Sequence, residues 1–226
     1  MQYQIIGEPT PVAQCTLDSG ESMKTESGSM VWMSPNMGMS TNAGGSVGKA
    51  LGRMLTGEKM FQNVYTAQGG SGMIAFGSSF LGSIRAVQLT PDKPIVCQKR
   101  AFLASEMGVE LSIFFQKRFG AGLFGGEGFI MQKLTGNGLV FLEIDGYAVE
   151  YDLAPGQTLI VDTGALAMCD STCSIDVQAI KGVSNVLFGG EGFFNTKITG
   201  PGRVTLQTTS VRSFAQQLIP YLPAKG

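Results

Sequence analysis

The chain has 226 residues and a formal net charge of −1, and charged residues make up only 15% of it, against a usual share of about 25%. It contains no histidine, which excludes imidazole bases, Ser-His and Cys-His nucleophile pairs, and histidine metal ligands. No basic excess is present to attract phosphates, so binding to nucleic acid is not expected.

The length is sufficient for one large domain or two small ones with a sizeable hydrophobic core. No run of 18 apolar residues occurs, so no transmembrane helix is predicted. The first residues contain neither a charged region nor an apolar stretch, so no signal peptide is predicted. Without export, the cysteines are expected to be reduced thiols in a cytoplasmic protein, at Cys15, Cys97, Cys169 and Cys173.

A heptapeptide, Leu-Phe-Gly-Gly-Glu-Gly-Phe, occurs at residues 123–129 and again, unchanged, at residues 187–193, and a weaker copy occurs at residues 54–60. Other landmarks keep a fixed spacing in all three copies. An interval of 13 separates Leu17 from Met30, Leu89 from Phe102 and Leu153 from Leu166, and an interval of 11 separates Glu58 from Gly69, Glu127 from Gly138 and Glu191 from Gly202. We therefore predict a single domain of three internal repeats, at about residues 3–78, 79–142 and 143–209.

In chain order, each copy begins with a strand that ends at Leu17, Leu89 or Leu153, and a polar turn and a second strand follow. An apolar run comes next, and later the Gly-Glu step leads into a further strand. A glycine turn then joins that strand to a returning strand, because glycine accepts a positive φ. Asp145-Gly146 predicts a type I′ hairpin between two strands. No repeat contains a long helical period, so the fold is predicted to be nearly all β.

One helix is predicted at residues 210–220. Ser210 is suited to cap its N-terminus, and Pro220 ends it. Its apolar residues fall on one face, at Val211, Phe214, Ala215, Leu218 and Ile219. We expect this face to pack across an open end or edge of the β structure and to shield an edge strand.

Three segments occur together with the heptapeptide and a downstream Gly-Pro-Gly: Gly7-Glu8-Pro9, Leu17-Asp18-Ser19-Gly20-Glu21 and Gly28-Ser29-Met30-Val31-Trp32-Met33. With this combination the chain resembles, over essentially its whole length, the family named for altered inheritance of mitochondria. That is a mitochondrial-biogenesis family with many uncharacterised bacterial and archaeal members. The resemblance implies a fold like that of the trp RNA-binding attenuation protein (TRAP), a short double-stranded β-helix or jelly-roll used as repeated units. It implies no enzymatic activity, and fold similarity alone does not imply RNA binding.

Three short motifs resemble chemical sites but lack parts that the chemistry needs. Residues 120–125 match the dinucleotide fingerprint, yet a strand follows them where the pyrophosphate requires a helix N-terminus. Residues 44–50 resemble a phosphate loop, yet Ala50 stands where a magnesium-binding Ser or Thr is required. Cys169 and Cys173 have neither a second pair nor a histidine to complete a zinc site. No cofactor, metal or catalytic residue is therefore predicted.

Glu58, Glu127 and Glu191 occupy the same place in the three copies. If the repeats bring them around one axis, their repulsion would require a cation or protons, which would make a ligand or cation site. Alternatively, each Glu accepts N–H hydrogen bonds from its own glycine-rich turn. We favour the second arrangement and keep a small-molecule or metal-binding β-domain as the alternative function.

Leu123, Phe124, Leu187 and Phe188 lie beside paired glycines in the repeated loops. On exposed loops they would form an apolar face that suits a protein partner or a peripheral contact with a membrane. Turned inward, they would instead fill the core. The low charge content favours an interface. The leading hypothesis is therefore a non-enzymatic binding or scaffold protein, a homo-oligomer that acts through its Gly-rich loops.

Overall fold

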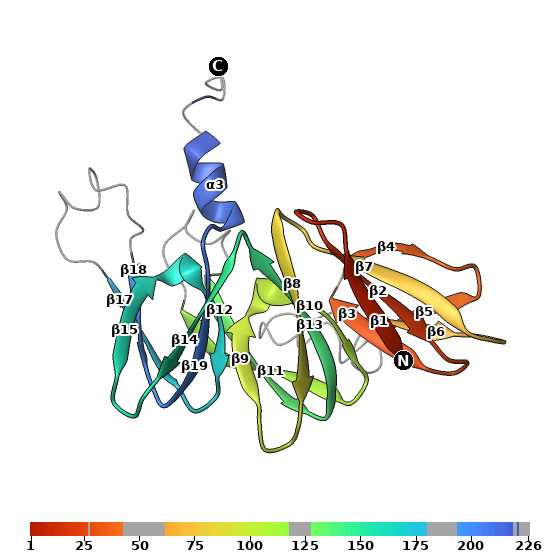
Figure 1. Ribbon diagram of the computed structural model, residues 1–226, viewed down its shortest axis with the longest axis horizontal. Helices are drawn as coiled ribbons and strands as arrows, with labels where there is room; N and C mark the ends of the chain where they lie inside the picture. The colour runs from red at the N-terminus through yellow and green to blue at the C-terminus, as the bar shows by residue number, and fades with distance from the viewer. Residues whose placement is uncertain (27, 43–61, 118–127, 180–193, 219–220, 222–226) are drawn as a thin grey trace, which may run out of the picture.

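The computed structural model describes residues 1–26, 28–42, 62–117, 128–179, 194–218 and 221. Within these residues it contains nineteen β-strands, short 3-10 turns and one α-helix near the C-terminal end (Figure 1). The prediction of a nearly all-β fold with a C-terminal helix is confirmed. In the described part of the chain, no helix is both long enough and apolar enough to span a lipid bilayer.

The strands form four antiparallel sheets, in which neighbouring strands follow these orders. The first sheet is β1 (Gln2–Ile6), β2 (Val12–Leu17), β7 (Gly72–Gly77) and β4 (Met30–Met33). The second is β5 (Met37–Asn42), β6 (Gln62–Ala67), β3 (Ser22–Glu26), β10 (Phe102–Glu106), β13 (Gly138–Asp145) and β8 (Gly82–Leu89). The third is β11 (Val109–Lys117), β12 (Phe129–Gly136), β9 (Ile95–Gln98), β16 (Leu166–Asp170), β19 (Gly202–Gln207) and β14 (Ala148–Leu153). The fourth is β15 (Thr158–Asp162), β18 (Phe194–Thr199) and β17 (Ser174–Ala179).

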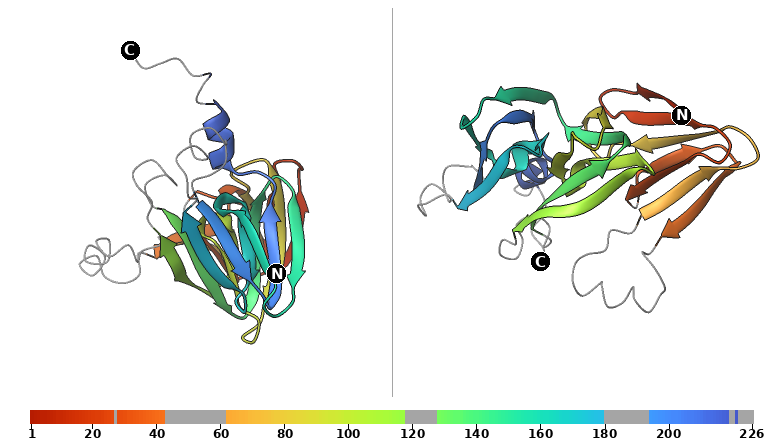
Figure 2. Two further views of the ribbon diagram at one scale, coloured as in Figure 1. Left: turned by 90° about the vertical axis from the view of Figure 1, so that its left-hand side faces the viewer. Right: turned by 90° about the horizontal axis from the view of Figure 1, so that it is seen from below.

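The sheets form an elongated row, with the first sheet at one end and the fourth at the other (Figures 1 and 2). Two 3-10 turns, η1 (Lys99–Ala101) and η3 (Thr163–Ala165), precede β10 and β16, and the helix α3 (Val211–Leu218) follows β19. The described residues contain three large apolar cores, one between each pair of successive sheets. They include, in order along the row, Phe76 with Phe141, Leu89 with Leu134, and Ile198 with Val204.

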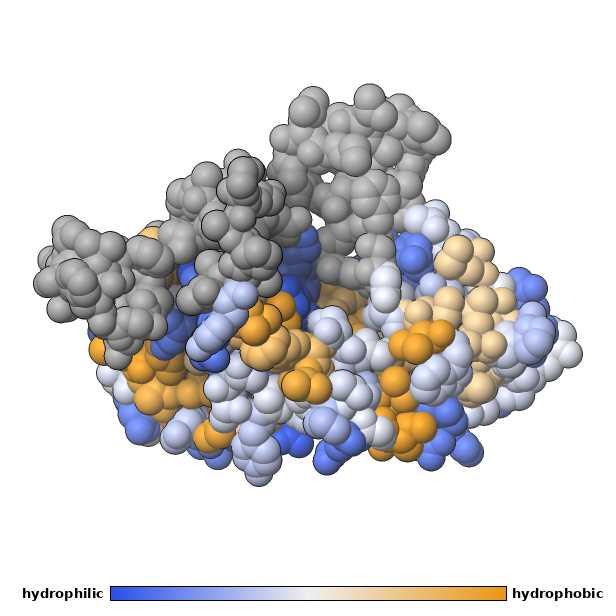
Figure 3. Space-filling model, turned by 90° about the horizontal axis from the view of Figure 1, so that it is seen from above, coloured by the Kyte–Doolittle hydropathy of each residue, from blue (hydrophilic) through white to orange (hydrophobic). Residues whose placement is uncertain are grey.

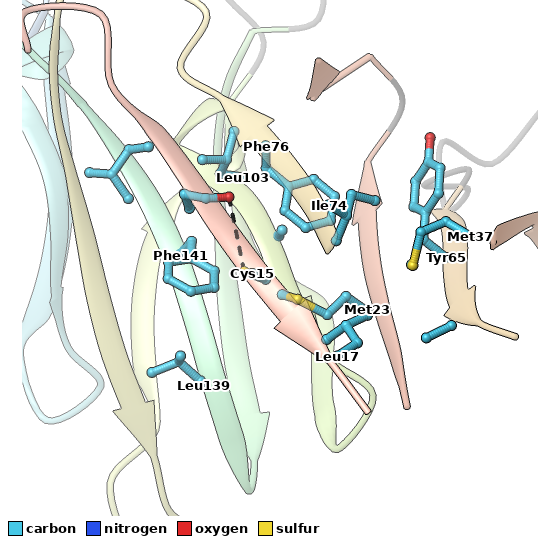
Figure 4. Packing of buried hydrophobic residues seen from close by; sticks show 14 residues of the cluster. Cys15, Leu17, Met23, Met37, Tyr65, Ile74, Phe76, Leu103, Leu139 and Phe141 are labelled. Atoms are coloured by element: carbon cyan, nitrogen blue, oxygen red, sulfur yellow. Dashed lines mark hydrogen bonds between the residues drawn. The ribbon is translucent and has the colours of Figure 1, made fainter. Parts of the chain in front are cut away.

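The core between the first two sheets is built from alternate residues of their strands (Figure 4). β2 contributes Cys15 and Leu17, β7 contributes Phe76, and β13 contributes Phe141, all at most 1% exposed. The ring of Tyr3 packs edge-on against Phe141, with 5.1 Å between the ring centroids. Burial of each large side chain in this core stabilises the fold by about 1.5–3 kcal/mol.

The middle sheets are covered on both faces, which explains the apolar run at residues 139–142 of β13. All eight residues of β13 are buried. Phe141 belongs to the core shared with the first sheet, whereas Leu142 belongs to the core shared with the third sheet. Successive residues of a strand point to opposite faces, so a strand between two cores is apolar at almost every position.

Three strand pairs share one register along the chain. Leu17 lies opposite Gly72 in β2 and β7, Leu89 lies opposite Gly138 in β8 and β13, and Leu153 lies opposite Gly202 in β14 and β19. Gly72, rather than the expected Gly69, therefore corresponds to Gly138 and Gly202, because the first turn is longer. The expected boundary between residues 142 and 143 falls inside β13, which ends at Asp145.

The hairpin expected at Asp145-Gly146 is absent. β13 pairs with β8 and β10, and the next strand, β14, pairs with β19 in a different sheet. Gly146 does adopt a positive φ of 71°, but its N–H donates to the carbonyl oxygen of Leu81 at 2.8 Å. The turn therefore carries the chain from the second sheet to the third.

The helix α3 forms where it was predicted but does not shield an edge strand. None of its residues is buried, and Phe214 and Leu218 of the expected apolar face are exposed. Its contacts lie at its first turns, where Phe214 packs against Phe80 with 5.4 Å between ring centroids. In Figure 1 the helix projects from the row instead of lying along a sheet.

Candidate functional site

All seven candidate site residues lie outside the described residues. These are Glu58, Glu127, Glu191, Leu123, Phe124, Leu187 and Phe188. Whether the glutamates converge, and whether the Leu-Phe pairs are exposed, therefore remain predictions. The candidate sites that the described residues do form lie elsewhere, in a cavity beneath α3 that two buried carboxylates line and at the two ends of the row.

A cavity of about 320 Å³ lies among η1, η3, the end of β13 and the first turn of α3. Two buried carboxylates line it, and they come from alternate positions of β13, so they point to the same face. Three cationic residues of η1 and α3 line it as well. The five ionisable residues of this cavity are Lys99, Arg100, Glu143, Asp145 and Arg212.

Glu143 is held by the turn that follows the first sheet. Its Oε2 accepts hydrogen bonds from Ser78 Oγ at 3.0 Å and from the Ser79 N–H at 2.6 Å, and its Oε1 accepts one from Ser79 Oγ at 3.0 Å. Burial raises the pKa of Glu143, and the serine hydrogen bonds oppose this increase in part. The carboxylate thus connects the first sheet to the second.

Asp145 connects the second sheet to the helix. Its Oδ2 accepts a hydrogen bond of 2.9 Å from the N–H of Val211, one of the N–H groups at a helix N-terminus that have no partner within the helix. Burial raises the pKa of Asp145, although this hydrogen bond and the charge of Arg100 lower it. Gln207 extends the network, since its Oε1 accepts from the Asp145 N–H and its Nε2 donates to the Gly164 carbonyl.

The geometry of this cluster indicates a structural role, in which it holds separate elements of the fold together. The hydrogen bonds that the carboxylates of Glu143 and Asp145 accept come from N–H and O–H groups of the protein itself, and Gln207 of β19 accepts from the Asp145 N–H, so the network joins three sheets and a helix. Opposite charges lie within one cavity, and the charge of Arg100 offsets part of the cost of burying Asp145.

The cysteines are buried and form no disulfide within the described residues. Burial raises the pKa of Cys15 to about 12, and it also raises the pKa of Cys169 and of Cys173. These three thiols are therefore protonated near neutral pH, whereas the thiolate is the form that attacks substrates and binds metals. In the described part of the chain they act as small core residues.

The two ends of the row expose apolar side chains. At one end, Val31 and Trp32 of β4 are exposed, and a hollow of about 390 Å³ beside them is also lined by Ile6 and Val12. At the other end, Ile160 of β15 is exposed. Seen from above, apolar residues reach the surface at several places along the row (Figure 3). Such patches suit a protein contact.

Sequence reasoning did not single out these end residues. Val31 and Trp32 belong to an apolar run that recurs in each copy, and a recurring apolar run predicts a core strand. The pattern of apolar residues does not distinguish a strand in the core from a strand at the end of the row.

Comparisons with known proteins agree with the resemblance seen in the sequence. The model of the mitochondrial biogenesis AIM24 family matches residues 3–209. An uncharacterised protein of Streptococcus pyogenes serotype M6 is 29% identical over 224 residues, covering 96% of this chain and 88% of that protein. A crystal structure of a Streptococcus pyogenes protein matches with a TM-score of 0.80 at 26% identity, covering 98% of this chain and 99% of that one. Because the family model spans nearly the whole chain, the protein belongs to the mitochondrial biogenesis AIM24 family.

Proposed function

We propose that the protein is a non-enzymatic scaffold that associates with further copies of itself. The observation that carries this proposal is the exposure of Val31, Trp32 and Ile160 on the outermost strands of the row. Water-exposed apolar residues of this kind gain free energy when a partner covers them. Because one molecule carries such surfaces at both ends, it can contact two further copies of itself, which favours assembly over a contact with one partner only.

The scaffold would consist of three copies of one TRAP-like β unit. The shared register of the three strand pairs supports this division, as does a β-bulge at the same place in each copy. The bulges lie between Met30 and Trp32, between Phe102 and Ala104, and between Leu166 and Met168. Bulges are specific features of a strand, so their recurrence favours a common ancestor for the three units.

The repeated Gly-rich loops would supply a second contact surface, through Leu123, Phe124, Leu187 and Phe188. The support is the unchanged heptapeptide, which keeps an apolar pair beside glycines in two copies. We place the protein in the cytoplasm, and its buried cysteines without disulfides are compatible with a reducing compartment.

Sedimentation velocity of the wild-type chain over a wide range of concentrations tests the proposal. The scaffold predicts a sedimentation coefficient that rises with concentration, because association obeys mass action. A chain that sediments as a monomer at every concentration would contradict it.

A further inference from the structure

We propose that copies of this chain associate head to tail, by main-chain pairing of β4 of one copy with β15 of the next. The inference rests on the proposed self-association and adds its surfaces, its register and its direction. The partner is a second copy of the same chain, and the argument comes from two junctions that already exist inside each copy.

Both internal junctions join a strand of one unit to a strand of the next in the same register. At the first, β3 pairs with β10, and Lys24 lies opposite Ser105. At the second, β9 pairs with β16, and Val96 lies opposite Cys169. The paired residues of the two junctions correspond to each other within the chain. Lys24 and Val96 are 72 residues apart, like Leu17 and Leu89, and Ser105 and Cys169 are 64 residues apart, like Leu89 and Leu153.

Each six-stranded sheet is the sum of two half-sheets. The second sheet joins β5-β6-β3 to β10-β13-β8, and the third joins β11-β12-β9 to β16-β19-β14. The sheets at the ends are the remaining halves. The fourth sheet, β17-β18-β15, corresponds to the half-sheets β5-β6-β3 and β11-β12-β9. The strands β4-β7-β2 of the first sheet correspond to the half-sheets β10-β13-β8 and β16-β19-β14. Within the described residues, β15 and β4 are the edges that have no counterpart.

The residues at the junction positions are buried inside the row, and their counterparts are exposed at its two ends. The bulged residue of the inner strands is hidden, with Leu103 at 2% and Ala167 at 0% exposure, whereas Val31 of β4 is 54% exposed. Likewise Lys24 is 8% and Val96 0% exposed, whereas Ile160 of β15 is 65% exposed. The first and last units thus keep apolar residues at positions that a junction covers elsewhere.

The two end strands contain little of the charge, and none of the proline, that usually protect an exposed edge from pairing. Exposed edges are commonly blunted by lysine, proline or a bulge. β4 contains no charged residue or proline, and β15 contains one charge, at its last residue, Asp162. The bulge of β4 does not prevent pairing, because β10 and β16 have the same bulge and pair on both sides.

The internal register fixes the contact between copies. Met33 corresponds to Ser105 and Cys169 in the internal junctions, and Ile160 corresponds to Lys24 and Val96. Met33 of one protein molecule should therefore lie opposite Ile160 of the next molecule. Residues directly opposite in an antiparallel pair have Cβ atoms about 4.5–5.5 Å apart. The two surfaces differ, so the contact is heterologous and builds a ring or an open chain.

Mixing two variants that each gain one exposed cysteine beside the four buried native ones, Met33→Cys and Ile160→Cys, tests this geometry under mild oxidation. The mixture should form a disulfide between the two variants, because the paired Cβ atoms lie within reach of an S–S bond. Each variant alone should form none, since a head-to-tail contact keeps like positions apart. Met33→Cys mixed with Met107→Cys is the matched control, because Met107 is an exposed methionine in the turn after β10, away from both end strands.

A disulfide of either variant with itself would overturn the proposal in favour of a two-fold contact. If the mixture forms no disulfide but sedimentation of wild type still shows oligomers, the pairing of β4 with β15 is overturned. The proposed scaffold would then remain, with a different contact surface. A second variant, Ile160→Lys, should weaken self-association about tenfold or more, because burial of an isoleucine is lost and a charge is introduced. Unchanged association of Ile160→Lys, with a melting temperature like that of wild type, would overturn the proposal as well.

Discussion

At the level of single residues, the carboxylates of Glu143 and Asp145 connect parts of the fold that lie far apart in the chain. Both are buried, and both depend on donors far away in sequence, at Ser78, Ser79 and Val211. Asp145 anchors the helix, and Glu143 anchors a turn of the first sheet. Their removal should therefore affect stability more than any chemistry.

The raised pKa of Glu143 predicts a pH dependence of stability. A carboxyl group whose pKa is higher in the folded protein stabilises the fold below its unfolded pKa, near 4.5, and this contribution is lost as the pH rises through the folded value. The free energy of unfolding of wild type should therefore fall, relative to that of Glu143→Gln, between a pH below 4.5 and neutral pH.

Urea unfolding of both proteins at several pH values measures this difference. Glu150→Gln is the matched control, because Glu150 is exposed on β14 and lies outside the cavity. A difference between wild type and Glu143→Gln that does not change with pH would contradict the structural account of this carboxylate.

The sequence alone could not reveal these ties. Residues 139–144 predicted a returning apolar strand, and β13 confirms the strand, yet a pattern of apolar residues says nothing of a glutamate within it. The donors to Glu143 lie 64 and 65 residues earlier in the chain, and only the packing of the first sheet on the second brings them close.

At the level of elements, α3 shows where periodicity predicts correctly and where it does not. The spacing of Val211, Phe214, Ala215 and Leu218 predicted the helix, and its bounds agree to within two residues. The same spacing also predicted a buried face, which was wrong. An apolar face allows packing but does not supply a surface to pack on, and only the first turns of α3 meet the β structure.

A chain that ends at Ser210 should fold and lose only about 1.5–2.5 kcal/mol of unfolding free energy. The truncation removes one hydrogen bond to Asp145, worth about 1 kcal/mol, and one ring pair, worth about 0.5–1.5 kcal/mol. Chemical denaturation measures the change, and Phe214→Ala isolates the share of the ring pair. A truncated chain that fails to fold would show that the helix supports the core after all.

At the level of the whole molecule, the predicted all-β class is confirmed, whereas the division into three copies stays a prediction. The interval of 13 that begins at Leu17, Leu89 and Leu153 ends in each case at a residue where a β-bulge begins, namely Met30, Phe102 and Leu166. What the sequence could not predict is how the copies join. Pairing of β3 with β10 and of β9 with β16 depends on edges that no periodicity describes, and so does the exposure of Val31 and Ile160 at the ends.

Hydrogen exchange of the wild-type chain at low and high concentration is the most direct test of the central claim. Main-chain pairing between copies would protect amides of β4 and β15 as concentration rises, because these N–H groups would gain partners. Amides of β1 and β5, which are also edge strands, serve as internal controls. The account predicts greater protection at Met30–Met33 and Thr158–Asp162 only. Equal exchange of these two strands at both concentrations, or new protection confined to another edge, would contradict it.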